Sequence, residues 1–119
     1  LQESWKDAAG MEFPQGCLVA RKTLIEERPE VIEAFLDYYD ESCAWVNKNL
    51  EDAGALVEKY EIGMTAQMAQ KAIPNSNIRL GKSYEVKDTV DKYLNVLYDF
   101  SPKEIGGKVP DEGFYYIKK

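Results

Sequence analysis

The residue types that carry most protein catalysis are scarce in this chain. Its 119 residues contain no histidine, so a nucleophile activated by an imidazole base is excluded. Cys17 and Cys43 form no CxxC pair, and a structural zinc site is therefore not expected. Adjacent carboxylates such as Glu26 and Glu27 point about 100° apart on a helix and cannot share a proton across a cleft. The sequence predicts no enzyme activity, no metal and no cofactor.

The elements that would position other functional groups are mostly helices. Pro29 is suited to open a long helix, because a proline at the first helical position loses no hydrogen bond. Apolar residues then recur at spacings of three and four, which predicts one buried helical face: Ile32, Leu36, Tyr39, Cys43, Val46 and Leu50. A second helix is predicted to end at Gly63, Thr65 to cap a third, and Ser83 to start a fourth.

Extended structure is expected in only two short places. Residues 16–20 are apolar throughout, as in a strand buried on both faces, and residues 78–80 form a second extended piece. The predicted fold class is α/β, predominantly α, with about four helices and one or two short strands. A chain of this length forms one domain, so residues 1–119 are treated as a single domain.

The composition of the chain limits the classes of partner that it is expected to bind. A hydrophobic fraction of 45% and 12% aromatic residues favour a folded chain. The net charge of −6 argues against nucleic acid or an anionic membrane, since both require a positive surface. No run approaches the roughly 20 apolar residues of a membrane span. A disulfide between the two cysteines is allowed by their number, but two positions cannot establish it.

Several segments together resemble one known family. They are Phe13-Pro-Gln-Gly-Cys-Leu-Val-Ala20, Glu26-Glu-Arg-Pro-Glu-Val31, Ala44-Trp-Val-Asn-Lys-Asn49, Lys71-Ala-Ile-Pro-Asn-Ser-Asn-Ile78 and Phe100-Ser-Pro-Lys-Glu-Ile-Gly-Gly-Lys-Val-Pro110. In order and spacing the chain resembles the C-terminal segment of an ABC-transporter solute-binding protein. The likeness is to the type II periplasmic-binding-protein branch that serves sulfonates, taurine, nitrate or thiamine precursors.

This resemblance implies a partial lobe of a larger two-lobed protein. Such a receptor binds a small organic solute in the periplasm, or lipid-anchored at the outer face of the cell membrane, and delivers it to an ABC permease. The family suggests small organic anions or heterocycles, such as sulfonates or pyrimidines. The loop that leads into the predicted strand would then contribute ligand contacts.

The candidate ligand-binding residues in that loop are Phe13, Gln15, Gly16 and Cys17. Gly16 permits close approach of the backbone, and the amide of Gln15 offers both hydrogen-bond donors and an acceptor. The alternative is that Pro14 and Gly16 only shape a turn into the strand. Two interpretations are also left for Tyr115 and Tyr116. They dock the C-terminal tail on the rest of the chain, or they project toward a partner.

Two further hypotheses concern association. A strand at 16–20 without its neighbours, together with helices without a sheet to cover, would favour self-association of this chain. The alternative function is a free-standing helical protein–protein interaction domain, whose amphipathic helices pack around their own core. The coding sequence upstream of Leu1 distinguishes the two functions, because a receptor needs an export signal and a first lobe there.

Overall fold

The computed structural model describes residues 1–118, and every regular element among them is helical. The helices are α1 (Gln2–Ala9), α2 (Lys22–Glu27), α3 (Pro29–Lys48), α4 (Leu50–Lys59), α5 (Ala66–Ala72), η1 (Ile73–Asn75), α6 (Ser83–Phe100), η2 (Pro102–Ile105) and η3 (Glu112–Phe114). The chain divides into two compact units. Unit 1 comprises Leu1–Arg21 and Gly81–Lys119, and unit 2 comprises Lys22–Leu80.

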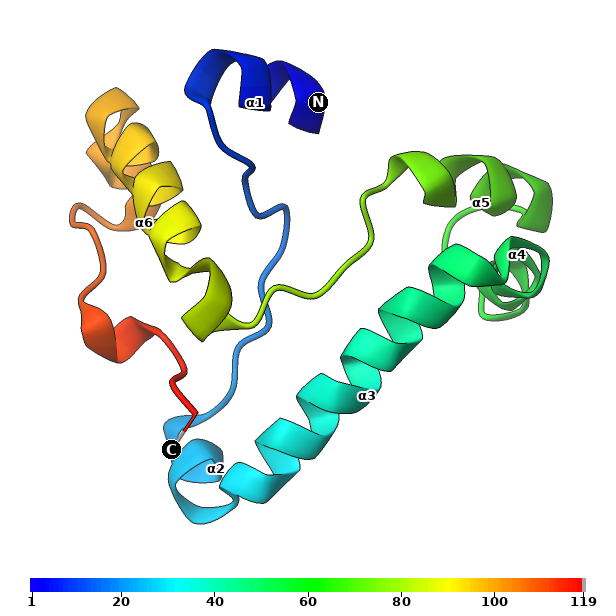
Figure 1. Ribbon diagram of the computed structural model, residues 1–119, viewed down its shortest axis with the longest axis horizontal. Coiled ribbons are helices and arrows are strands. Elements are labelled where there is room, and N and C mark those ends of the chain that lie inside the picture. Colours follow the sequence, from blue (N-terminus) through cyan, green and yellow to red (C-terminus); the bar gives the residue numbers. More distant parts are fainter. Residues whose placement is uncertain (119) are drawn as a thin grey trace. The chain divides into compact units, whose positions relative to one another are not determined.

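The predicted α/β class is wrong, because the described residues contain no strand and form a small helical fold. Residues 16–20 are coil and solvent-exposed, and they run as a thin trace between α1 and α2 in Figure 1. A strand is completed by hydrogen bonds to a neighbouring strand. No segment among residues 1–118 supplies that neighbour, so the apolar run at 16–20 and the piece at 78–80 stay irregular.

The helices begin where local capping signals place them. Pro29 occupies the first turn of α3, which Figure 1 shows as one uninterrupted helix, and Ser83 is the first residue of α6. The hydroxyl of Thr65 accepts a hydrogen bond from the Met68 amide, 3.3 Å away, and so caps α5 as predicted.

The predicted end of α4 was misplaced. The helix ends at Lys59, and the first left-handed residue after it is Glu61, with φ of 54°; Gly63, with φ of 74°, follows two positions later. The Ile62 amide donates to the Val57 carbonyl and the Glu61 amide to the Glu58 carbonyl. These two bonds form a Schellman motif, which satisfies the last carbonyls of the helix even without glycine.

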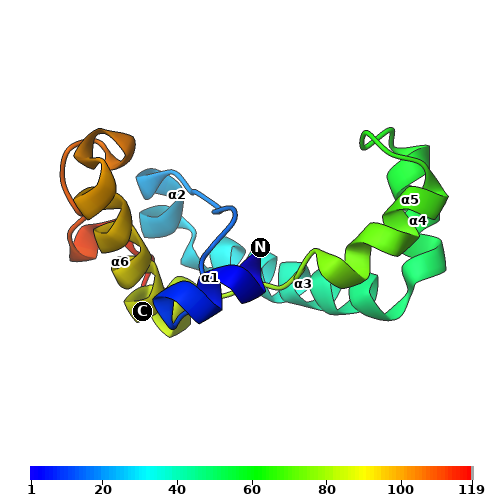
Figure 2. The ribbon, with the colours of Figure 1, turned by 90° about the horizontal axis from the view of Figure 1, so that it is seen from above.

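Unit 2 is built on the close packing of α4 against α5, which lie side by side in Figures 1 and 2. Its small core consists of Ala53, Ala69 and Ile73, with Val46 and Leu50 packed beside it. The backbones approach so closely that a Cβ added at Gly54 would lie 2.6 Å from the Ala66 carbonyl oxygen. Small residues therefore set the distance between these helices.

Hydrogen bonds from side chains fasten the ends of the unit 2 helices. The Asn47 amide donates to the carbonyls of Cys43 and Ile78, each at 2.8 Å, and so ties the coil after η1 to α3. The Glu58 carboxylate accepts from the Ala66 amide at 2.9 Å, at the start of α5. These contacts hold the three longer helices of unit 2 in a fixed arrangement around a core of very few buried residues.

Unit 1 is held together by aromatic side chains. Trp5 of α1 contacts Phe13 and Tyr93, with ring centroids 5.4 and 5.5 Å away, and Phe13 stacks on Tyr93 at 5.7 Å. Edge and stacked ring contacts of this kind add to the area that the rings bury. They fix α1 and the coil after it on α6.

Candidate functional site

The structure assigns Phe13 a packing role. Its ring belongs to the aromatic cluster with Trp5 and Tyr93. Its backbone is also held by the Gln2 side chain: Nε2 of Gln2 donates to the Phe13 carbonyl at 2.7 Å, and Oε1 of Gln2 accepts from the Phe13 backbone amide at 3.3 Å. A residue engaged on both ring and backbone positions the loop, and a ligand contact of Phe13 stays a prediction.

The other three predicted ligand residues follow Phe13 in the coil and are exposed. Gln15, Gly16 and Cys17 all lie at the surface, and Cys17 is a free thiol. A Cβ at Gly16 would meet no atom within 4 Å. The space beside Gly16 is therefore open, and the role of this loop in ligand binding stays a prediction.

The second cysteine is buried. Cys43 is a free thiol on α3, and burial, assisted by the charge of Asp40, raises the pKa of that thiol. A thiol with a raised pKa carries less of the nucleophilic thiolate at neutral pH. Cys43 therefore acts as a small apolar side chain.

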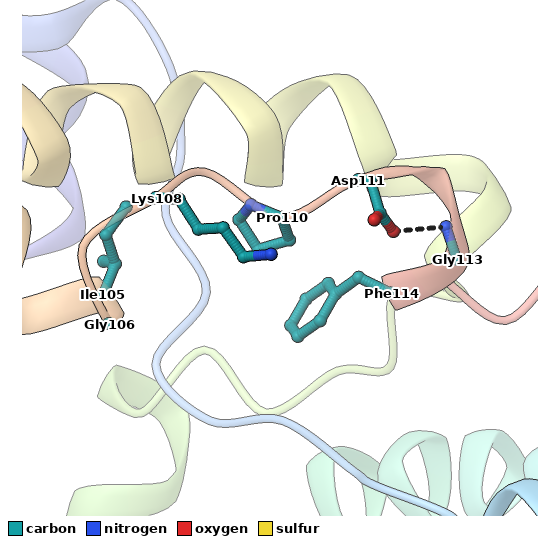
Figure 3. Close-up of a pocket in the computed structure, with 7 residues that line it drawn as sticks. All are labelled: Ile105, Gly106, Lys108, Pro110, Asp111, Gly113 and Phe114. Atoms are coloured by element: carbon teal, nitrogen blue, oxygen red, sulfur yellow. Dashed lines mark hydrogen bonds between the residues drawn. The ribbon is translucent and has the colours of Figure 1, made fainter.

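A surface pocket lies entirely in unit 1, and we name it the C-terminal pocket. It has a volume of about 480 Å³ and is lined by Ile105, Gly106, Lys108, Pro110, Asp111, Gly113 and Phe114. Figure 3 shows the Lys108 side chain and the Phe114 ring bordering the same space. The Asp111 carboxylate accepts a hydrogen bond from the Gly113 amide at 3.0 Å and caps η3.

A polar network next to the pocket fastens the tail to α6. The Tyr115 hydroxyl donates to the Asp91 carboxylate at 2.5 Å, and the Lys87 ammonium donates to the other oxygen of that carboxylate, also at 2.5 Å. Lys87 also pairs with Glu112 at 3.1 Å and lies over the Tyr115 ring, 4.9 Å from its centroid. The Ser83 hydroxyl donates to the Tyr116 carbonyl. Of the two alternatives for Tyr115, docking of the tail is the one observed.

The network shifts the protonation equilibria of its members. Hydrogen bonds to Asp91 and Glu112 raise the pKa of Lys87 above its usual value. Hydrogen bonds from Lys87 and Tyr115 lower the pKa of Asp91. Burial, followed by the hydrogen bond to the Asp91 carboxylate, raises the pKa of Tyr115 to about 12. At neutral pH the charged lysine, charged carboxylate and neutral phenol are all favoured.

The second cavity lies in unit 2 and we name it the apolar groove. It encloses about 290 Å³ and is lined only by apolar side chains, those of Trp45, Val46, Ala53, Leu56, Val57, Ile62, Ile73 and Ile78. The lining comes from α3, α4 and η1 and from the coil after α4 and after η1. Without a polar group to orient a small molecule, the groove fits an apolar side chain or helix face better than a polar solute.

The sequence predicted part of the lining of these two cavities, but it did not predict that either cavity is a binding site. Val46 belongs to the apolar face that the helical spacing predicts for the helix opened by Pro29. The C-terminal pocket lies in a segment that periodicity describes only as a loop. In the sequence this pocket corresponds only to a lysine and a phenylalanine near a Gly-Gly pair and a proline. Such a combination is too common in proteins to predict a binding site.

No family model, no curated protein and no solved structure matches this chain. Within residues 1–118, no group of three or more cysteine and carboxylate side chains is arranged to hold a metal ion. None of the helices described here is long and apolar enough to cross a membrane.

Proposed function

We propose that this chain is the C-terminal segment of the solute-binding component of an ABC importer. That component would capture a small organic anion or heterocycle outside the cytoplasm and deliver it to a permease. The proposal begins from the family resemblance of the segments between Phe13 and Pro110. The observation that supports it is the amount of apolar surface that the chain leaves uncovered.

The exposed area is larger than a self-contained fold requires. The chain exposes 9192 Å² of surface. Two separate domains, each with half of the 13.6 kDa mass, would together expose about 7,900 Å². The excess of about 1,300 Å² is in the range of a specific protein interface. A chain with this excess is expected to be covered by further protein.

The distribution of the buried residues points the same way. The only buried hydrophobic residues among residues 1–118 are Cys43, Ala53, Ala69, Ile73 and Tyr115. Val19 in the apolar coil is 90% exposed, and Leu18 beside it is also exposed. Apolar side chains exposed to water are unfavourable, and burial against the remainder of a receptor would remove that cost. The exposed Gln15, Gly16 and Cys17 would then be carried to the edge of the binding cleft.

The experiment that tests this proposal is to sequence the gene upstream of the Leu1 codon together with its neighbours. The proposal expects an in-frame export signal, roughly 200 residues of preceding receptor, and adjacent permease and ATPase genes. A start codon immediately before the Leu1 codon, without such neighbours, would contradict it.

A second candidate function is a helical protein–protein interaction domain, and the apolar groove favours it. A preformed apolar groove between helices is a recognised docking site for an amphipathic helix. The excess area suffices for a stable interface between two copies of this chain. We therefore propose that, under this alternative, the occupant of the groove is a second copy.

The oligomeric state tests this alternative. Light scattering after size-exclusion chromatography is expected to give about 27 kDa, twice the mass of the 13.6 kDa chain. Leu56→Glu places a charge in the groove and is expected to give the monomer. Val96→Glu is the matched control, because Val96 is also helical and is 41% exposed against 40% for Leu56. A monomeric wild type, or a Leu56→Glu dimer, would contradict the second-copy interface.

A further inference from the structure

The C-terminal pocket combines an uncovered aromatic ring with a cation. The Phe114 side chain is 62% exposed although it lines a cavity, and Ile105 and Pro110 supply further apolar wall. The ammonium of Lys108 makes no ion pair and no ring contact with any residue between 1 and 118. In Figure 3 the lysine side chain extends across Pro110 toward the side of the pocket where the ring lies.

The segment that forms the pocket is anchored at both ends. At one end, η2 packs on α6 and is followed by Gly106 and Gly107, whose φ angles are 76° and 86°. At the other end, Tyr115 is anchored to Asp91 through its hydroxyl. Because both ends of the segment are fixed, a ligand entering the pocket would lose little affinity to ordering of the chain.

The charged side chains that line the pocket determine which kind of ligand it favours. The single lining cation, Lys108, favours an anionic group, while the single lining carboxylate, Asp111, opposes one. That carboxylate already accepts the Gly113 amide, which partly satisfies it. The repulsion from the Asp111 carboxylate orients a bound ligand, because the negative group of the ligand is stabilised only beside Lys108. Its apolar body would then lie against the phenylalanine ring, where flat rings stack favourably.

We propose that the C-terminal pocket binds a small flat organic anion, a single aromatic ring that carries one carboxylate or sulfonate. The anionic group pairs with Lys108 and the ring packs on Phe114. A volume of about 480 Å³ accommodates one such ring. This site is separate from the loop at 13–17, and it does not depend on the importer proposal.

The test is an NMR titration of the chain with three probes. Benzoate carries both the ring and the charge, benzamide the ring alone, and acetate the charge alone. Benzoate is expected to shift the amide signals of residues 105–114 with a Kd of about 1–10 mM, because so small a ligand on an open surface gains modest affinity. Benzamide, which lacks the charge, is expected to bind up to about fivefold more weakly, and acetate, which lacks the ring, is also expected to bind more weakly.

Variants assign the two contacts. Lys108→Gln is expected to make benzoate bind as weakly as benzamide, whereas Lys103→Gln, a change at an exposed lysine outside the pocket lining, leaves benzoate binding unchanged. Phe114→Leu is expected to weaken benzoate and benzamide alike. Equal affinities for benzoate and benzamide in the wild type would overturn the proposal. So would shifts centred outside residues 105–114, or the absence of any shift at about 50 mM benzoate.

Discussion

Gly54 offers a direct test of how unit 2 is packed, because two known effects on it have opposite signs. Glycine inside a helix is about 1 kcal/mol less favourable than alanine, so helix propensity alone makes Gly54→Ala stabilising. The new methyl group, however, would lie 2.6 Å from the Ala66 carbonyl oxygen and 2.7 Å from Cγ of Gln70. The glutamine side chain can move away, but the backbone carbonyl cannot move without α5.

The magnitude follows from this geometry. Ordinary contact begins at 3.4 Å, so α4 and α5 must separate by several tenths of an ångström to admit the methyl group. Overpacking of this kind costs typically 1–3 kcal/mol. Subtracting the gain in propensity leaves a net loss of up to about 2 kcal/mol in the free energy of unfolding. We therefore expect Gly54→Ala to destabilise the chain.

The assay is urea unfolding followed by circular dichroism at 222 nm, in a sucrose buffer that strengthens the folded state. Ala55→Gly calibrates the propensity term, because Ala55 is the exposed next residue on the same helix and its loss is expected to cost about 1 kcal/mol. If Gly54→Ala instead stabilised the chain by the amount that Ala55→Gly destabilises it, the close packing of α4 and α5 would be refuted.

Three further predictions concern single sites. Glu61→Gly is expected to stabilise the chain by about 1 kcal/mol in the same urea assay, because a non-glycine residue with φ of 54° is strained; an unchanged midpoint would contradict the Schellman end of α4. The pKa of Tyr115 is raised to about 12, so the neutral phenol contributes fully to the stability of the fold below about pH 10, and this contribution is lost between about pH 10 and pH 12. Ultraviolet titration should show one late tyrosinate, which Asp91→Asn moves to lower pH; no late tyrosinate would disprove the tail contact. Ellman's reagent is expected to label exposed Cys17 at once and buried Cys43 only on unfolding, and equal rates would contradict the burial of Cys43.

The parts of the fold that the sequence predicts correctly are those determined by near neighbours in the chain. Pro29, Thr65 and Ser83 mark helix starts because a cap or a first-turn residue acts within a few positions. The end of α4 was misplaced because left-handed backbone is favoured by glycine but is not restricted to it, and Glu61 takes that conformation.

The errors arise where a residue's state depends on distant partners. The apolar run at 16–20 reads as a strand, but pairing requires a second strand that residues 1–118 lack. The sequence also did not predict that the ring of Phe13 packs on Tyr93, eighty positions away, because no local pattern reveals such a contact. Lys108 and Phe114 line one pocket in a segment whose end is anchored by the hydrogen bond of Tyr115 to Asp91, a contact between residues 24 positions apart.

The claim that underlies both proposed functions is that this chain leaves apolar surface for other protein to cover. Equilibrium urea unfolding of the dilute, monomeric chain tests that claim most directly. With so few buried side chains, we expect a free energy of unfolding below about 3 kcal/mol and a weakly cooperative transition. A sharp two-state transition with about 5 kcal/mol or more, independent of protein concentration, would show that the monomer covers its own core and would contradict the account.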